Sequence, residues 1–154
     1  MNTPYVAVFG GCNMDISGKS KTALLPHDSN PGDVSMTPGG VGRNIAANIA
    51  LVGIHTEIVT AFGDDDKKTL ILQNAPEKLS FESAFTFDDV GTGSYLVVLD
   101  DEGEMVVAVN DMKAVDKLGR EEMESRRELA ENASYTVVDA NLKEEALQTI
   151  FSWD

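Results

Sequence analysis

The chain has 154 residues, of which 42% are hydrophobic, so its length predicts one domain and its apolar content is enough for a core. Its 26 acidic and 12 basic residues leave a net charge of −14, which argues against nucleic acid or an anionic membrane surface as a partner. Cys12 is the only cysteine, which excludes a disulfide framework and a cysteine-based zinc site. There is no signal-peptide pattern and no stretch of transmembrane length, so we expect a soluble, cytoplasmic protein.

The first predicted element is a buried strand of a parallel sheet over residues 5–9 (YVAVF), which ends at two glycines. Asn13 and Asp15 follow, where ligands of open α/β sheets collect. Two residues apart in an extended chain, their side chains point the same way and offer an amide and a carboxylate to sugar hydroxyls. The alternative is that both residues only shape a turn. Residues 17–37 are polar and turn-rich, and they predict an excursion from the main sheet.

A glycine-rich turn leads into a predicted helix that ends before Gly53, with Ile45, Ile49 and Val52 on one apolar face. Gly39, Gly40 and Gly42 let the backbone approach a polyhydroxylated or anionic ligand and direct N–H groups at it, and Asn44 can donate and accept. A plain turn before a packed helix is the alternative. The glycine spacing fits neither a dinucleotide fingerprint nor a P-loop.

Residues 57–61 (EIVTA) are predicted as the strand that closes a first βαβ unit. Three aspartates at 64–66 then indicate either a metal site or, as we favour, the cap of a helix beginning near Lys67. A hairpin is predicted from 94–100 (SYLVVLD) and 104–110 (EMVVAVN). Its apolar side chains exceed what one hairpin can hide, so we expect it to pack on the sheet or on a second subunit.

Three further elements are predicted in the last part of the chain. They are a solvent-facing helix over 116–131, a buried strand over 135–138 and an amphipathic helix over 142–153. Asn141 follows the strand and is a fourth candidate polar group at a strand end.

Four segments in combination resemble the ribokinase-like (PfkB) family of sugar and nucleoside kinases. They are GGCNMDISG at 10–18, PGGVGRNIAANIALVG at 38–53, FGDD at 62–65 and SYLVVLDDEGEMVVAVNDM at 94–112. Within the family, GGVGRN and MVVAVNDM are most similar to the pseudouridine kinases. The resemblance implies an α/β fold, a partial parallel sheet flanked by helices, with a small β-lid formed by segments at about 16–38 and 94–110.

The resemblance also implies roles for the candidate residues. Asp15 would hold ribose hydroxyls with Asn13 beside it, and the turn of Gly39, Gly40 and Gly42 would approach the sugar. Asn44 would hydrogen-bond the sugar, and Asn141 matches a further strand end that contacts it. No catalytic residue and no metal ligand is assigned in this chain.

Members of this family transfer the γ-phosphoryl group of ATP, with Mg²⁺, to a primary hydroxyl of the sugar. Their catalytic aspartate lies in a GAGD-type segment, which this sequence lacks, as it lacks the ATP-binding half. We therefore expect residues 1–154 to be the N-terminal portion of a ribokinase-like domain, inactive alone: a truncated product, a split subunit or an excised fragment. Its expected partners are a small sugar or nucleoside and either a second copy bound through the lid or a complementing C-terminal chain. The alternative is a non-catalytic module that binds a nucleoside or dimerises.

Overall fold

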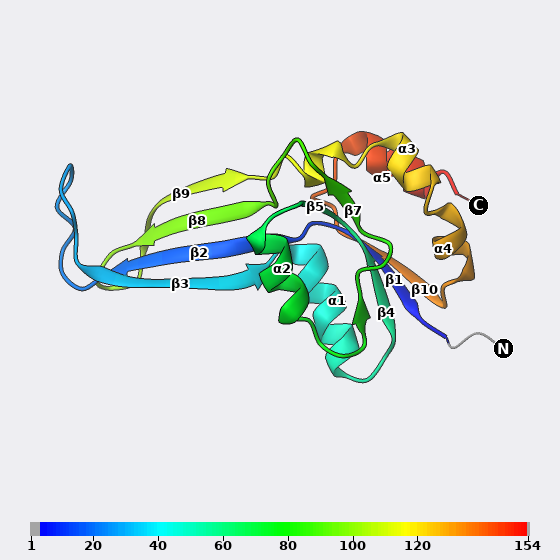
Figure 1. Ribbon diagram of the computed structural model, residues 1–154, viewed down its shortest axis with the longest axis horizontal. Helices are drawn as coiled ribbons and strands as arrows, with labels where there is room; N and C mark the ends of the chain where they lie inside the picture. The colour runs from blue at the N-terminus through cyan, green and yellow to red at the C-terminus, as the bar shows by residue number, and fades with distance from the viewer. Residues whose placement is uncertain (1–3, 154) are drawn as a thin grey trace.

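The structure is a computed structural model that describes residues 4–153. Its main sheet consists of four parallel strands. The strand order is β10-β1-β4-β6, and helices cover both faces (Figure 1). The bounds are β1 Val6–Phe9, β4 Thr56–Val59, β6 Leu79–Ser80 and β10 Tyr135–Val138. All four residues of β1 are buried, as the continuous apolar run predicts for a central strand. The predicted α/β class is confirmed.

Helix α1 (Val41–Leu51) packs on one face of this sheet through small residues. Gly42, Ala46 and Ala50 are buried at four-residue spacing, so the helix lies close to the strands. Ile45 and Ile49 pack at the edge of the same cluster. The prediction for Val52 is wrong, because the helix ends at Leu51 and the Val52 side chain is 75% exposed.

The predicted stop of this helix at Gly53 is confirmed. Gly53 has a φ of 93°, and its N–H donates to the Ala50 carbonyl. The Ile54 N–H donates to the Ile49 carbonyl, which completes a Schellman motif.

The other face of the main sheet carries the larger core. Ala7, Phe9 and Val59 face helices from the last part of the chain, and Phe9 meets Trp153 edge to face with ring centroids 5.8 Å apart. The elements on this side are η1 Val115–Lys117, α3 Arg120–Glu124, α4 Arg127–Asn132 and α5 Glu144–Phe151.

Two predictions for this part of the chain are corrected. The single solvent-facing helix over 116–131 is broken into η1, α3 and α4, because the chain bends to bury Leu118 and Met123 in the core. The strand over 135–138 forms as β10, but Tyr135 is 74% exposed. Within residues 4–153, β10 pairs only with β1, so it is an edge strand and not a buried one.

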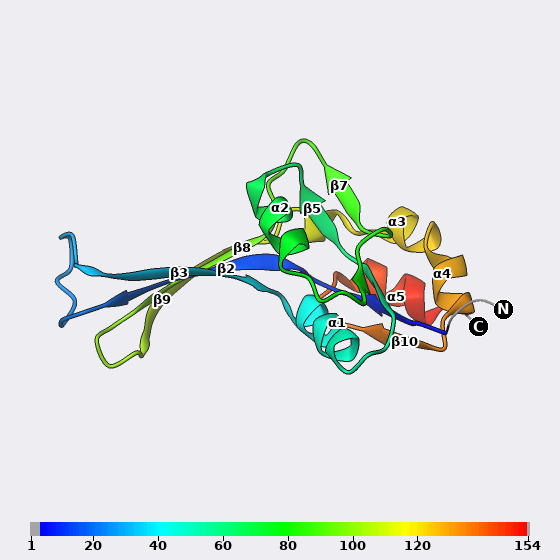
Figure 2. The ribbon, with the colours of Figure 1, turned by 60° about the horizontal axis from the view of Figure 1, so that its bottom comes forward.

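A second sheet of four strands, here called the projecting sheet, extends away from the main body (Figures 1 and 2). Its order is β3-β2-β8-β9, with β2 and β8 parallel and the outer pairs antiparallel. The bounds are β2 Asn13–Ser20, β3 Gly32–Gly39, β8 Ser94–Leu99 and β9 Met105–Asp111. The predicted excursion and hairpin thus form one continuous sheet.

The register gives the projecting sheet one apolar face, because directly paired residues share a face. One cross-strand row is Met36, Ile16, Leu96 and Val109, and the next is Val34, Gly18, Val98 and Val107. Five of these side chains are among the exposed large hydrophobic residues of the chain: Val34, Met36, Leu96, Val107 and Val109.

Helix α2 (Asp66–Gln73) and a small parallel pair, β5 (Ala61–Gly63) with β7 (Phe85–Phe87), lie between the two sheets. Asp65 caps α2 by accepting from the Lys68 N–H at 3.1 Å and also accepts from the Thr92 N–H at 2.8 Å. The favoured interpretation of the acidic run as a helix cap is confirmed. The predicted strand 57–61 is interrupted after Val59, and its last residue begins β5.

Candidate functional site

The candidate site forms where the first strand of the projecting sheet leaves the main body. Asn13 is 5% exposed, and its Nδ2 donates to Asp15 Oδ1 at 2.5 Å. The two side chains therefore lie on the same side of β2, as their spacing predicts. Because the amide N–H₂ is directed at Asp15, the oxygens that accept hydrogen bonds are the free Oδ2 of Asp15 and the Oδ1 of Asn13.

Gly39 lies directly against this pair. It is the register partner of Asn13 in the β2–β3 ladder, and a Cβ built on it would collide with the Asp15 carboxylate. A glycine is thus required to bring the backbone of β3 next to that carboxylate.

The rest of the glycine turn packs on the end of β1. Gly40 has a φ of 97°, and a Cβ there would lie 2.5 Å from the Gly11 carbonyl oxygen. A Cβ on Gly42 would lie 2.6 Å from the Gly10 Cα. Of the three predicted glycines, the structure therefore places Gly39 against Asn13 and Asp15, and it places the other two against the backbone at the end of β1. Close backbone packing explains the composition of the turn.

Asp139, which sequence reasoning passed over, holds this arrangement in place. It follows β10 and is 3% exposed, and its Oδ2 accepts from the N–H groups of Gly11 at 3.2 Å and Gly42 at 3.1 Å. Its Oδ1 accepts from the Asn141 N–H at 2.9 Å and from the Asn141 Nδ2 at 2.7 Å. The sequence did contain a signal for this role. It was an aspartate placed directly after a predicted strand of the sheet whose strand ends adjoin the glycine-rich turn.

Asp139 also restricts the chemical class of ligand that can bind at the glycine turn. One N–H group that was expected to face a ligand, that of Gly42, is occupied by its carboxylate, which also accepts from the N–H of Gly11. The acceptor oxygens of Asp15 and Asn13 remain, and they suit hydroxyl donors. This site is therefore better matched to a polyhydroxylated ligand than to an anionic one.

The two remaining predicted residues lie at the rim. Asn141 is exposed, and its amide N–H₂ is directed at Asp139, so it reaches the cluster only through that carboxylate. Asn44 is exposed on the first turn of α1, and its Oδ1 accepts from Arg43 Nη1 at 3.3 Å. Because its oxygen is engaged, the Nδ2 of Asn44 is the group left to donate to a ligand.

Cys12 lies behind the site and is fully buried. Burial raises the pKa of its thiol to about 12, with the Arg43 charge lowering it and the Asp15 carboxylate raising it further. The thiol is protonated at neutral pH and is not a nucleophile.

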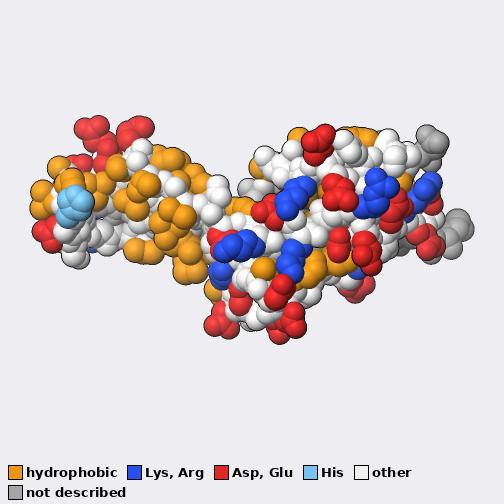
Figure 3. Space-filling model, turned by 90° about the horizontal axis from the view of Figure 1, so that it is seen from above, with side chains coloured by type: hydrophobic (Ala, Val, Ile, Leu, Met, Phe, Trp, Pro, Cys, Tyr) orange, Lys and Arg blue, Asp and Glu red, His pale blue; other side chains and the backbone are white. Residues whose placement is uncertain are grey.

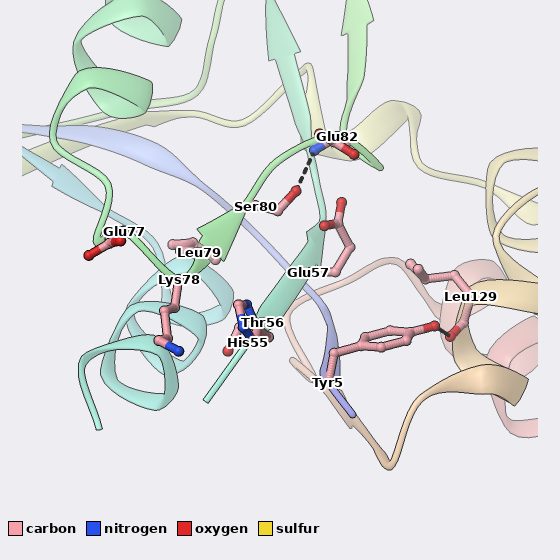
Figure 4. Close-up of a pocket in the computed structure, with 10 residues that line it drawn as sticks. All are labelled: Tyr5, His55, Thr56, Glu57, Glu77, Lys78, Leu79, Ser80, Glu82 and Leu129. Carbon is pink, nitrogen blue, oxygen red and sulfur yellow. Dashed lines mark hydrogen bonds between the residues drawn. The ribbon is translucent and has the colours of Figure 1, made fainter. Parts of the chain in front are cut away.

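A groove of about 420 Å³ lies at the opposite end of the main sheet, at the amino ends of its strands (Figure 4). The Tyr5 hydroxyl there donates to the Leu129 carbonyl at 2.7 Å, and Glu57 accepts from the Ser83 N–H at 2.6 Å. Burial and the nearby Glu57 and Glu128 raise the pKa of Tyr5. The groove shares no residue with the site at the carboxyl ends of the strands.

Comparison with known proteins identifies the family. Residues 3–153 match the model of the pfkB family carbohydrate kinases. The chain belongs to the pfkB family. This pfkB-family chain is 39% identical over 147 residues to pseudouridine kinase of Escherichia coli strain K12, covering 95% of this chain and 47% of that protein.

Solved structures confirm the ribokinase-like fold. A carbohydrate kinase from Agrobacterium tumefaciens superposes with a TM-score of 0.85 at 28% identity, covering 96% of this chain and 49% of that one. A ribokinase from Arabidopsis thaliana, complexed with ribose and ATP, shares the fold with a TM-score of 0.80 at 18% identity, covering 97% and 49%. The pfkB-family chain thus spans about half the length of these relatives.

The pfkB family implies ATP and Mg²⁺, and the described residues of this chain show no clustered set of ligands for the metal. Within residues 4–153, no group of three or more His, Cys, Asp or Glu side chains is placed to hold a metal ion. At the start of α1, the Gly42 N–H that could have contacted a phosphate is bonded to Asp139. In the same part of the chain, no helix has both the length and the apolar character to cross a membrane.

Proposed function

We propose that this chain is the sugar-binding and lid-bearing part of a pfkB-family kinase whose substrate is pseudouridine. The observation that carries the proposal is the carboxylate of Asp15, held by Asn13 and packed against the backbone of Gly39. The similarity to the Escherichia coli pseudouridine kinase supports this nucleoside as the substrate.

In this proposal the chain binds and orients the sugar. The free oxygens of Asp15 and Asn13 accept hydrogen bonds from ribose hydroxyls, and the Nδ2 of Asn44 donates to a hydroxyl oxygen. Asn141 acts at the rim through Asp139. The glycine turn excludes side chains from the space where the sugar lies beside the backbone.

We assign phosphoryl transfer to the other half of the fold, which is present in the longer relatives. ATP and Mg²⁺, when bound, supply the phosphoryl group and neutralise its charge. Because the sequence lacks the GAGD-type segment that carries the catalytic aspartate in the family, the chain alone should not phosphorylate pseudouridine.

Calorimetric titration with pseudouridine and with ribose tests the binding role. Asp15→Ala removes a charged acceptor and should lower the affinity for both ligands by about 10- to 100-fold. Asn44→Ala removes a neutral donor and should weaken them by about 2- to 10-fold. Asp33→Ala is the matched control, since Asp33 is an exposed aspartate on β3 that pairs with Lys21. A folded wild-type chain that takes up neither ligand would contradict the proposal.

The projecting sheet is proposed as the lid, with segments at about 16–38 and 94–110. Figure 3 shows hydrophobic side chains gathered over this sheet, whereas charged side chains gather over the main body. Because the apolar face is contiguous across four strands, we propose that a second copy of the chain covers it. Analytical ultracentrifugation tests this, and a monomer at high protein concentration would contradict it.

The apolar face also favours the second candidate function, a module that binds a nucleoside or dimerises without catalysis. The two functions are distinguished by supplying the separately produced C-terminal half of the Escherichia coli pseudouridine kinase, with ATP and Mg²⁺. Phosphorylation of pseudouridine by the mixture, and by neither part alone, supports the kinase. Binding without phosphorylation in the mixture supports the module.

A further inference from the structure

Asp15 belongs to a row of four side chains that crosses the projecting sheet on its polar face. Its register partners are Thr37 on β3 and Tyr95 on β8, and Tyr95 is in turn paired with Asn110 on β9. Directly paired residues share a face. The row therefore lies on the side opposite the apolar face, and it continues the candidate site outward from the main body.

Tyr95 provides an aromatic surface beside Asp15. Its side chain is half-buried, and its hydroxyl lies 3.9 Å from the sulfur of Met105. Met105 pairs with Leu99, four residues further along β8, so the ring extends along the sheet and does not stand away from it. A ring in this position presents a face on which a planar base can stack.

Asn110 provides a polar group at the end of the row. It is exposed on β9, and its carboxamide makes no hydrogen bond to another residue in the described part of the chain. A carboxamide both donates and accepts, which matches the alternating N–H and C=O groups on the edge of a uracil ring.

The distances along the row match a nucleoside bound through its sugar at Asp15. Neighbouring strands lie about 4.8 Å apart, so Asp15 and Asn110, two strands apart, are separated by roughly 10 Å. A ribose over Asp15 would place an attached base over Tyr95 with its far edge toward Asn110. In the opposite direction the row has only Thr37, since β3 is the edge of the projecting sheet in the described chain.

We propose that Tyr95 and Asn110 form a base subsite that selects a pyrimidine nucleoside over a free sugar. Tyr95 stacks on the base, and Asn110 hydrogen-bonds its edge, while Asp15 holds the ribose. This inference rests on the proposed function, because it requires the ribose to lie at Asp15.

The test compares the dissociation constants for pseudouridine and for ribose in each variant by calorimetry, with thermal unfolding as a check of folding. Tyr95→Leu keeps the site apolar but removes the ring, and it should weaken pseudouridine by roughly 5- to 100-fold. Asn110→Ala should weaken pseudouridine by roughly 2- to 10-fold. Neither variant should change the affinity for ribose, because ribose reaches neither residue.

Two control variants separate the subsite from general effects on the sheet. Tyr95→Phe keeps the stacking surface and should leave both affinities unchanged. Val109→Ala changes the residue next to Asn110 on the opposite, apolar face and should also leave both unchanged.

The outcomes distinguish this inference from the proposed function. Two outcomes would overturn the base subsite and leave the sugar site standing. One is that the wild type binds ribose and pseudouridine with equal affinity. The other is that Tyr95→Leu and Asn110→Ala weaken the binding of both ligands equally. A folded wild-type chain that binds neither ligand would overturn both.

Discussion

The main sheet and the projecting sheet are built from similar β-rich sequences, yet they use their apolar residues differently. In the main sheet, β1 is buried along its whole length because α1 covers one face and α5 the other. In the projecting sheet, β9 is exposed at six of its seven positions, with only Ala108 half-buried. The body is therefore stabilised by its own packing, whereas the apolar face of the projecting sheet is free for contact with another molecule.

The largest effect is expected in the body, from Asp139→Ala. The substitution leaves the N–H groups of Gly11 and Gly42 without an acceptor at a buried site, and each such loss costs about 1–3 kcal/mol. We expect the free energy of unfolding to fall by about 3 kcal/mol in urea denaturation. Asn141→Ala, which removes one donor at the exposed rim, should cost about 1 kcal/mol or less. Equal losses in the two variants would show that Asp139 does not hold the turn.

The two regions should also differ in how their stability responds to a methyl group added at a glycine. In the body, Gly42→Ala places a Cβ 2.6 Å from the Gly10 Cα, and overpacking should outweigh the gain in helix propensity by about 2 kcal/mol. In the projecting sheet, Gly18→Ala meets no atom within 4 Å, so stability should stay within about 0.5 kcal/mol of the wild type. Thermal unfolding of both variants measures the contrast, and similar melting temperatures would contradict it.

The connection between the regions should depend on pH through Asp65, which joins the start of α2 to Thr92 at the root of β8. Burial raises the pKa of Asp65, but hydrogen bonds from Thr92 and the Lys68 N–H, with the Lys67 charge, outweigh it and hold the pKa below its usual value. A lowered pKa means that the contribution to stability is present above the usual value near 4 and is lost as the pH falls through the folded-state pKa.

Comparison with Asp65→Asn measures this contribution. Asparagine keeps the cap but loses the charge, so the variant should be about 1 kcal/mol less stable at neutral pH. The difference should disappear in acid, as urea denaturation at a series of pH values would report. A difference that persists at about pH 2 would rule out ionisation of Asp65 as its cause.

The smallest effect on stability is expected on the apolar face of the projecting sheet. Met36→Thr and Val107→Thr change side chains that are 50% and 51% exposed, and each should alter stability by less than about 0.5 kcal/mol. If a second copy binds this face, the same variants should weaken self-association in analytical ultracentrifugation. Unchanged association would place the dimer contact elsewhere.

Local patterns were sufficient to predict the elements whose signals lie within a few residues. The apolar run of β1, the glycine stop at Gly53 and the hairpin of β8 and β9 all formed as expected. The pairing of Asn13 with Asp15 also follows from their spacing alone.

Apart from Val52, the errors arose where a residue far away in the sequence decides the local conformation. The helix expected over 116–131 breaks because Leu118 and Met123 must both reach a core formed with Phe9 and Ala146, far away in sequence. Asp139 could not be assigned because its partners, the N–H groups of Gly11 and Gly42, are brought to it only by the pairing of β10 with β1. The rows across the projecting sheet likewise depend on a register that no single strand specifies.

The contacts of Asp139 have a consequence for the order in which the site is built during synthesis. Its carboxylate binds Gly42 across 97 residues and Gly11 across 128. At roughly 5–20 residues per second, the ribosome adds Asp139 about 5–20 seconds after Gly42. During that interval a nascent chain already contains Asn13, Asp15 and the helix α1, but the glycine turn has no buried acceptor to fix it. The proposed sugar binding should therefore appear late in translation, only after β10 has emerged and paired with β1.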